Sequence, residues 1–143
     1  MRVNTSSGAM TFSGGSMGPA LTRDDFLAGS LATDAKAAVV NEPWITFEFR
    51  PEPLVAASAV FKDSTLVELR FIMTEATDHE EPLKEQNEIR RKSIHDEWLS
   101  AQVGSGPHHF PWGSIESDFD PRSLCSQIIV RYARDPSRER IDG

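Results

Sequence analysis

The chain has 143 residues, a length that fits one domain, and its 22 acidic against 15 basic residues give a formal net charge of −7. This charge disfavours nonspecific binding to nucleic acid, which requires clustered lysine and arginine side chains. The single cysteine, Cys125, excludes an internal disulfide, and no apolar run reaches the about 18 residues of a membrane-spanning helix, so we expect a cytoplasmic protein that does not enter a membrane.

The N-terminal part of the sequence predicts a tail and then a short helix. Residues 1–20 are rich in glycine and serine and offer little to bury, which is typical of a flexible tail. The stretch LTRDDFLAGSLA that follows predicts a helix with Thr22 as its N-cap. Its side chains expected to pack inward are Phe26, Leu27 and Leu31.

Three strands are predicted next, because apolar side chains recur at every second residue. In ITFEFR, the residues Ile45, Phe47 and Phe49 fall on one face. Two further apolar runs surround the sequence KDST, in which Asp63 and Ser64 favour a turn, so this stretch predicts a β-hairpin. The residues of its second arm expected to face the core are Val67, Leu69, Phe71 and Met73.

The highly charged residues 78–104 predict one long surface helix, with Pro82 in its first turn and Gly104 at its end. We interpret most of the charge as a solvated helix face, on which Glu88 and Lys92 form a pair four residues apart. A narrow apolar seam would pack on a sheet. The seam consists of Leu83, Ile94, Trp98 and Ala101.

A second hairpin is predicted near the C-terminus, where SIESDFD and SQIIVRY alternate around the turn signal DPRS. The order is then one helix, three strands, one helix and two strands. It predicts an α+β fold, an antiparallel sheet of about five strands with one long amphipathic helix packed on one face. We expect a single domain over residues 21–134, followed by a polar tail at residues 135–143.

The loop GPHHFPWG offers candidates for chemistry, since the imidazoles of His108 and His109 could bind zinc or exchange protons. Adjacent side chains of an extended loop point in opposite directions, so we expect no metal site there, and no cofactor. Cys125 is interpreted as a packing residue rather than a nucleophile. One alternative stays open, a small enzyme or ligand carrier whose pocket lies between the sheet and the long helix and uses a histidine with a carboxylate.

The leading hypothesis is instead a binding protein without enzymatic activity. Three carboxylates alternate along one predicted strand face and would attract a basic partner. The large indole of Trp112 either seals the core or anchors that partner. The predicted partner-binding residues are Trp112, His108, His109, Glu116, Asp118 and Asp120.

The segments IHDEWLSAQVG, FPWGSIESDFDPRS and SQIIVRY, with a weaker match at NEPW, resemble small bacterial proteins of the toxin-immunity and accessory type, which end in a PWG, DPR and IVRY hairpin. This resemblance implies a protein that works by occupying a toxin or a secreted effector. The predicted order of elements is also similar to that of type III secretion chaperones, which implies a chaperone-like accessory role. A homodimer formed through an unpaired strand edge is a further hypothesis.

Overall fold

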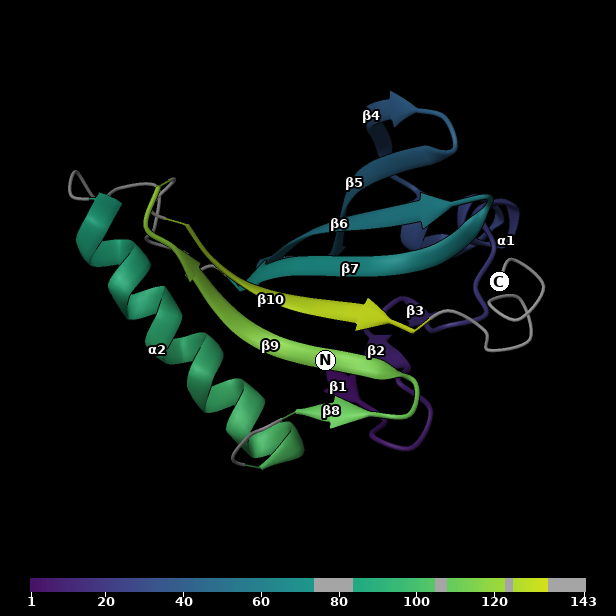
Figure 1. The fold of residues 1–143 in the computed structure, drawn as a ribbon. Helices are drawn as coiled ribbons and strands as arrows, with labels where there is room; N and C mark the ends of the chain where they lie inside the picture. Colours follow the sequence, from purple (N-terminus) through teal and green to yellow (C-terminus); the bar gives the residue numbers. More distant parts are fainter. Residues whose placement is uncertain (74–83, 105–107, 123–124, 134–143) are drawn as a thin grey trace.

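The computed structural model describes residues 1–73, 84–104, 108–122 and 125–133. Two antiparallel sheets make up most of this part of the chain, a small one of order β1-β2-β3 and a seven-stranded one of order β4-β5-β6-β7-β10-β9-β8 (Figure 1). The strands of the small sheet are β1 (Arg2–Val3), β2 (Met10–Phe12) and β3 (Gly15–Met17). Those of the large sheet are β4 (Lys36–Asn41), β5 (Trp44–Glu52), β6 (Val55–Lys62), β7 (Thr65–Met73), β8 (His109–Phe110), β9 (Gly113–Asp120) and β10 (Cys125–Tyr132). The helices are α1 (Arg23–Ala28), a 3-10 turn η1 (Ser30–Ala32) and α2 (Lys84–Val103).

The predicted fold class, a five-stranded α+β sheet with one long helix packed on it, is wrong. The protein is mostly β, and its two sheets hold ten strands in the described residues. The strands that were not predicted are short or lack the alternation of apolar and polar residues. Every residue of β4 is exposed, so neither of its faces selects apolar side chains, and β8 has only two residues.

Residues 1–20 form the small sheet instead of a flexible tail. Met10, Phe12 and Met17 are buried, and the ring of Phe12 meets the ring of Phe71 edge-on with 6.1 Å between centroids. The glycine and serine residues between them form turns that bring three short strands together. The composition that indicated a tail is therefore the composition of tight turns. The predicted polar tail at residues 135–143 lies outside the described residues.

Three hydrogen bonds from distant parts of the chain hold the N-terminal segment. The indole Nε1 of Trp112 donates to the carbonyl of Thr5 at 2.8 Å, and the hydroxyl of Tyr132 donates to the carbonyl of Gly8 at 2.9 Å. The backbone N–H of Val3 donates to the side-chain oxygen of Gln102 at 3.0 Å. The three partners, Gln102, Trp112 and Tyr132, are about 100 residues or more from the N-terminal segment in sequence. The first residues of the chain therefore pack against its C-terminal half.

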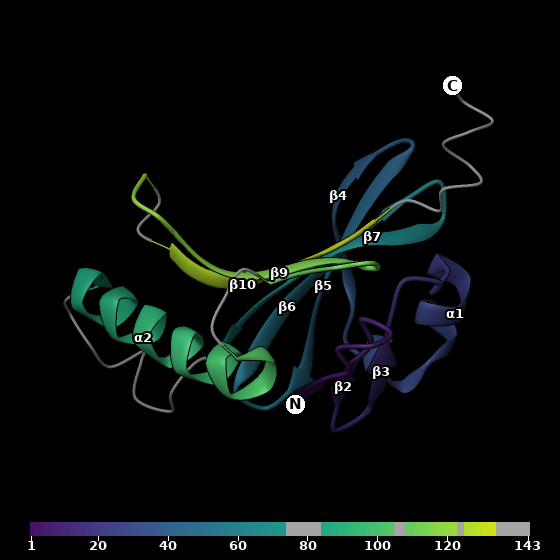
Figure 2. The same cartoon turned by 60° about the horizontal axis from the view of Figure 1, so that its bottom comes forward.

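The small sheet, α1 and α2 all lie on one side of the seven-stranded sheet (Figure 2). The α1 helix begins as predicted, with the hydroxyl of Thr22 accepting the N–H of Asp25 at 3.2 Å. Phe26 is buried against an aromatic cluster of the sheet, whereas Leu27, which was expected to pack, is 47% exposed. The rings around Phe26 are Phe47, Phe49 and Phe61.

The hairpin of β6 and β7 is confirmed, and its turn shows why. Asp63 and Ser64 have φ angles of 50° and 69°, the left-handed conformation that a two-residue hairpin turn requires. The pairing of Val60 with Glu68 is followed by Phe61 with Leu66, so Val67 is an extra residue. This bulge turns Leu66 rather than Val67 into the core.

The α2 helix ends at Gly104 as predicted, where a φ of +78° lets the glycine N–H donate to the carbonyl of Ser100 at 2.9 Å. Its inner face is not the predicted apolar seam. Buried positions include Glu88, His95 and Leu99, while Ala101 is exposed. Lys92 pairs with Asp96, Glu88 pairs with Arg91, and Pro82 and Leu83 lie outside the described residues. None of the described helices combines the length and the hydropathy needed to cross a bilayer.

Candidate functional site

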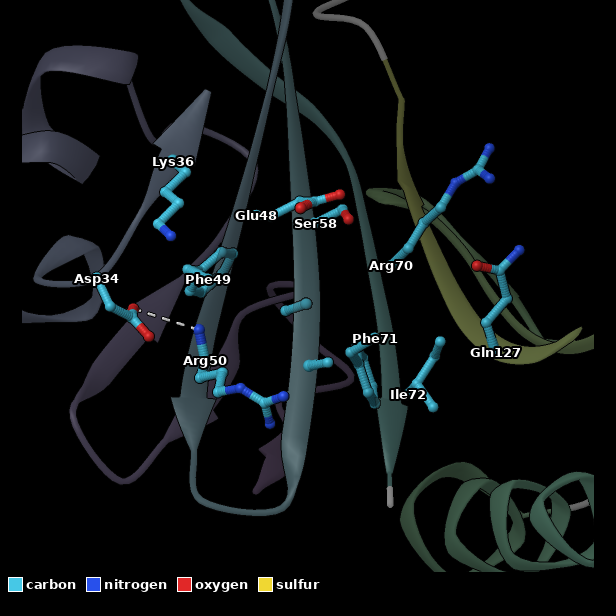
Figure 3. A pocket seen from close by; sticks show the side chains of 12 residues that line it. Asp34, Lys36, Glu48, Phe49, Arg50, Ser58, Arg70, Phe71, Ile72 and Gln127 are labelled. Carbon is cyan, nitrogen blue, oxygen red and sulfur yellow. Dashed lines mark hydrogen bonds between the residues drawn. The ribbon is translucent and has the colours of Figure 1, made fainter. Parts of the chain in front are cut away.

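The seven-stranded sheet has a second side, opposite α1, α2 and the small sheet, and we call it the open face (Figure 2). In the part of the chain that the structure describes, no helix or further sheet covers it. A hollow of about 500 Å³ lies on this face across β5, β6 and β7. Asp34 and Lys36 border it at one side, and Gln127 of β10 borders it at the other (Figure 3).

The hollow is lined by charged side chains above a floor of small residues. Pairing of the strands places Lys36 opposite Glu48, Glu48 opposite Ser58, and Ser58 opposite Arg70. Figure 3 shows Lys36 and Arg50 along one side of the hollow, with Arg70 across from them. The lining therefore combines three cations with two acids, since Asp34 also belongs to it.

Lys36 and Arg50 differ from Arg70 in their ion pairing. No ion pair within 4.0 Å joins either side chain to an acid of the described part. The backbone N–H of Arg50 donates to the carboxylate of Asp34 at 3.3 Å, which fixes the strand but leaves the guanidinium available. Arg70 differs, because its Nε donates to Glu68 at 2.8 Å.

Beside the hollow, a ladder of charges crosses β7, β10 and β9. Glu68 contacts Arg70 on its own strand and also lies 3.3 Å from the Nε of Arg131. Arg131 in turn forms an ion pair with Glu116, and this hydrogen bond raises the pKa of the guanidinium. Arg131 therefore forms a cross-strand pair with an acid of β9.

The acids of β9 share the open face, as their alternation indicates. We call Glu116, Asp118 and Asp120 the acidic strip. Glu116 is partly neutralised by Arg131, Asp118 lies opposite Gln127, and a carboxylate oxygen of Asp120 accepts the N–H of Arg122 at 2.9 Å. Among the described residues no group of three or more histidines, cysteines and acids could hold a metal ion. The strip is an electrostatic surface without the geometry of a metal site.

Trp112 does not lie on this surface. Its side chain is 8% exposed, stacks on Phe110 with 4.9 Å between ring centroids, and contacts Tyr132. The structure thus favours the alternative in which Trp112 seals the core. Of the two histidines, His108 donates from Nε2 to the carbonyl of Gly104 at 2.8 Å, and His109 is exposed on the edge strand β8. Partner binding by the six predicted residues stays a prediction.

An exposed tryptophan does lie on the open face, at Trp44. It is 41% exposed near the turn between β4 and β5, and the ammonium of Lys62 lies 5.0 Å from its ring centroid. Val39, on the neighbouring strand and opposite Thr46, is 56% exposed. The sequence held a signal for this residue, because Trp44 falls in phase with the polar positions 46, 48 and 50 of its strand.

A second polar cluster is buried between α2 and the sheet. His95 is 0% exposed; its Nε2 accepts the N–H of Met73 at 3.0 Å, so its Nδ1–H donates to the hydroxyl of Ser126 at 2.9 Å. The N–H of Ser126 donates to the carboxylate of Glu88 at 2.8 Å. Burial, and then the positive charge of Arg91, lowers the pKa of His95 to about 4.

This cluster joins a helix to a sheet and is closed to substrates. Both His95 and Ser126 are fully buried, so the pair cannot act as a base and a nucleophile on a molecule from solution. Trp98 and Leu99 pack beside it, and Trp98 meets Phe71 edge-on with 5.5 Å between centroids. In the described part of the interface between α2 and the sheet, these side chains occupy space in which the enzyme alternative placed a pocket. The hollow on the open face contains no histidine.

Comparison with known proteins finds a similar fold but no related sequence. No protein-family model and no curated protein sequence matches the chain. A solved structure does. The structure is similar to a chain of "Rhs1-CT in complex with cognate immunity protein RhsI1", with a TM-score of 0.62 and 17% sequence identity, over 99% of this chain and 94% of that chain. At this identity the likeness shows a shared fold. The C-terminal PWG, DPR and IVRY pattern itself stays a prediction.

Proposed function

We propose that this chain is the immunity protein of a toxin system, which binds a toxin domain in the cytoplasm and blocks it by occupation, without catalysis and without a cofactor. The observation that carries the proposal is the fold shared, over 99% of the chain, with a chain of a toxin–immunity complex. The features of the open face support it.

The open face has the parts of a protein interface. Trp44 supplies an exposed aromatic side chain of the kind that dominates binding energies, with exposed Val39 beside it. Seven paired strands form a rigid frame beneath these side chains, so little conformational entropy is lost when a partner binds. Charged side chains surround the hollow and line β9, which gives the face a polar rim.

The charge of the chain bears on the choice of partner. A net charge of −7 attracts a basic toxin from a distance and raises the rate of encounter, an effect that salt screens. The acidic strip adds to this field on the face that we expect to dock. A basic toxin is therefore the expected partner.

The test is to express the toxin domain encoded beside this gene, with and without this protein. We expect co-expression to restore growth and the two purified proteins to elute as one complex. Trp44→Ser should weaken the complex, whereas Leu27→Ser, which removes a similarly exposed apolar side chain on α1, should not. A wild-type protein that neither protects cells nor binds the toxin would refute the proposal.

A further inference from the structure

We infer that the toxin adds an extended segment to the outer edge of β9, and that every second residue of this segment is basic. The part of β9 concerned is residues 116–120, which we call the β9 edge. This inference rests on the proposed function and deepens it, since it specifies how the partner binds and which side chains it contributes. The segment would continue the seven-stranded sheet beside the acidic strip.

The β9 edge has no neighbouring strand on its outer side among the described residues. The two-residue strand β8 pairs with β9 only at Gly113 and Ser114, and one further bond joins the N–H of Ile115 to the carbonyl of His108 at 3.2 Å (Figure 1). Beyond Ile115, the pairing of β9 is with β10 alone. The α2 helix contacts β10 and β7 as well as β9, so it packs beneath the sheet and does not take the place of a further strand (Figure 2).

The register shows which backbone groups of the β9 edge point outward. In an antiparallel pair, residues alternate between those that bond to the neighbouring strand and those that point away from it. The N–H of Ile115 points away from β10, and those of Ser117 and Phe119 therefore do so too. Extension of the β8 register would place Gly104 opposite Phe119, but the N–H of Gly104 is bonded within α2 and its carbonyl accepts from His108. The backbone N–H and C=O of Phe119 are thus without a partner in the described ranges, and an added strand would bond to both.

The acidic strip selects the side chains of the added strand. β9 contains no basic residue, and Glu116 is paired with Arg131 of β10. No cation of the described part lies within 4.0 Å of the carboxylates of Asp118 and Asp120. On an added strand, the side chains that share the open face would lie about 4.5–5.5 Å from these acids between Cβ atoms, a separation at which opposite charges stabilise the pair. Lysine or arginine at every second position fits this face.

The positions between the basic residues face the other side of the sheet. Ile115 and Phe119 point to this side, since they alternate with the acids, and Phe119 is partly exposed. Apolar side chains at the intervening positions would cover it. The expected segment therefore alternates basic and apolar residues.

The same charges disfavour a second copy of this chain as the occupant. Two β9 edges that pair in antiparallel orientation about Asp118 would set Glu116 of each copy opposite Asp120 of the other, and Asp118 opposite Asp118. Like charges directly opposite each other destabilise a strand pair. A basic toxin provides the complementary charge.

The first experiment follows amide hydrogen exchange by NMR in the free protein and in its complex with the toxin domain encoded beside this gene. We expect the N–H of Phe119 to exchange rapidly in the free protein and at least tenfold more slowly in the complex. The N–H of Asp118, which by the same alternation points toward β10, is the internal reference and should be protected in both states.

The second experiment measures toxin binding by titration calorimetry. We expect at least tenfold weaker binding for Asp118→Lys and a change of less than twofold for Glu97→Lys. The control makes the same change in net charge at an exposed position of α2. Thermal melting of both variants verifies that they are folded, and the exchange experiment on the wild type does not depend on either variant.

The outcomes separate this inference from the proposed function. If the wild type binds the toxin but the exchange of Phe119 is unchanged, or Asp118→Lys binds within twofold of the wild type, no basic strand is added at β9, and the immunity role stands. If the wild type binds no toxin, the proposed function fails, and the edge is tested with a blocked hexapeptide of alternating lysine and valine. A saturable shift of the Phe119 N–H signal that a hexapeptide of alternating glutamate and valine does not cause would support the inference, and no shift would overturn it.

Discussion

Acid should destabilise this protein through one buried histidine. His95 accepts a hydrogen bond from Met73 at Nε2 and donates one to Ser126 from Nδ1, so its imidazole is neutral. A proton added at Nε2 would occupy the lone pair that accepts the backbone N–H of Met73, and this hydrogen bond would be lost. It would also place a cation between α2 and the sheet, where Arg91 is already nearby.

The size of the effect follows from the pKa of His95. The folded state holds this pKa at about 4, against an ordinary value of 6.5, so the unfolded state binds the proton more tightly. The stabilisation is complete above the unfolded pKa and is lost as the pH falls from 6.5 toward 4. At about 1.36 kcal/mol per pKa unit, the full range corresponds to about 3 kcal/mol, of which about 2.5 kcal/mol is lost between about pH 7 and about pH 4.5.

The assay is urea unfolding at these two pH values, followed by tryptophan fluorescence, for the wild type and for His95→Gln. Glutamine cannot titrate in this range, so acidic side chains contribute equally to both proteins and cancel in the comparison. We expect the wild type to lose about 2.5 kcal/mol more than the variant on acidification. Equal losses, or an NMR titration that finds the pKa of His95 near its ordinary value, would refute the reasoning.

Three further predictions concern the N-terminal closure and the open face. Trp112→Ala should lower the free energy of unfolding by about 3–5 kcal/mol in urea titrations, because it removes a buried indole and its hydrogen bond to Thr5. Gly8→Ala should lower the melting temperature more than Gly104→Ala, since both glycines have positive φ but only at Gly8 would an added Cβ meet another side chain, at 2.5 Å from Trp112. Trp44→Ala should change the free energy of unfolding by less than about 1 kcal/mol while it weakens toxin binding measured by titration calorimetry.

The strands that the sequence predicts are those with one buried and one exposed face. Phe47 and Phe49 of β5, Leu69 and Phe71 of β7, and the apolar residues of β10 alternate with polar ones because each strand separates a core from water. In β10 the alternation is imperfect, since Ile129 on the open face is also buried. The charge ladder explains this, because Arg131 and its acidic partners surround that position.

The N-terminal sheet and β4 could not be predicted by the same rule. The strands of the small sheet have two or three residues each, too few for a period to emerge, and their stability comes from Trp112 and Tyr132 more than 100 residues away. β4 is exposed on both faces, so its sequence KAAVVN shows no alternation. Tertiary contacts decide such segments, and local sequence does not encode those contacts.

The site shows the same division. Alternation placed Glu116, Asp118 and Asp120 on one face without any knowledge of the fold. The burial of Glu88 contradicts its interpretation as part of a solvated helix face, because its partner Ser126 lies on a distant strand. His95, which binds the same serine, was hidden for the same reason. The hollow was equally hidden, since strand order brings its cations together from β4, β5 and β7.

The edge of the sheet formed by β4 is poorly suited to pairing with a further strand. A homodimer or a partner that adds a strand at this edge would require β4 to present a regular row of backbone groups. Its register against β5 shifts between Ala37 and Val39, and such a bulge twists an edge and interrupts the row. The exposed side chains of this region do not depend on that regularity, because Trp44 and Val39 project onto the open face beside the hollow. The irregular register of β4 therefore disfavours strand addition at this edge, which agrees with the proposal that a partner docks on the open face instead.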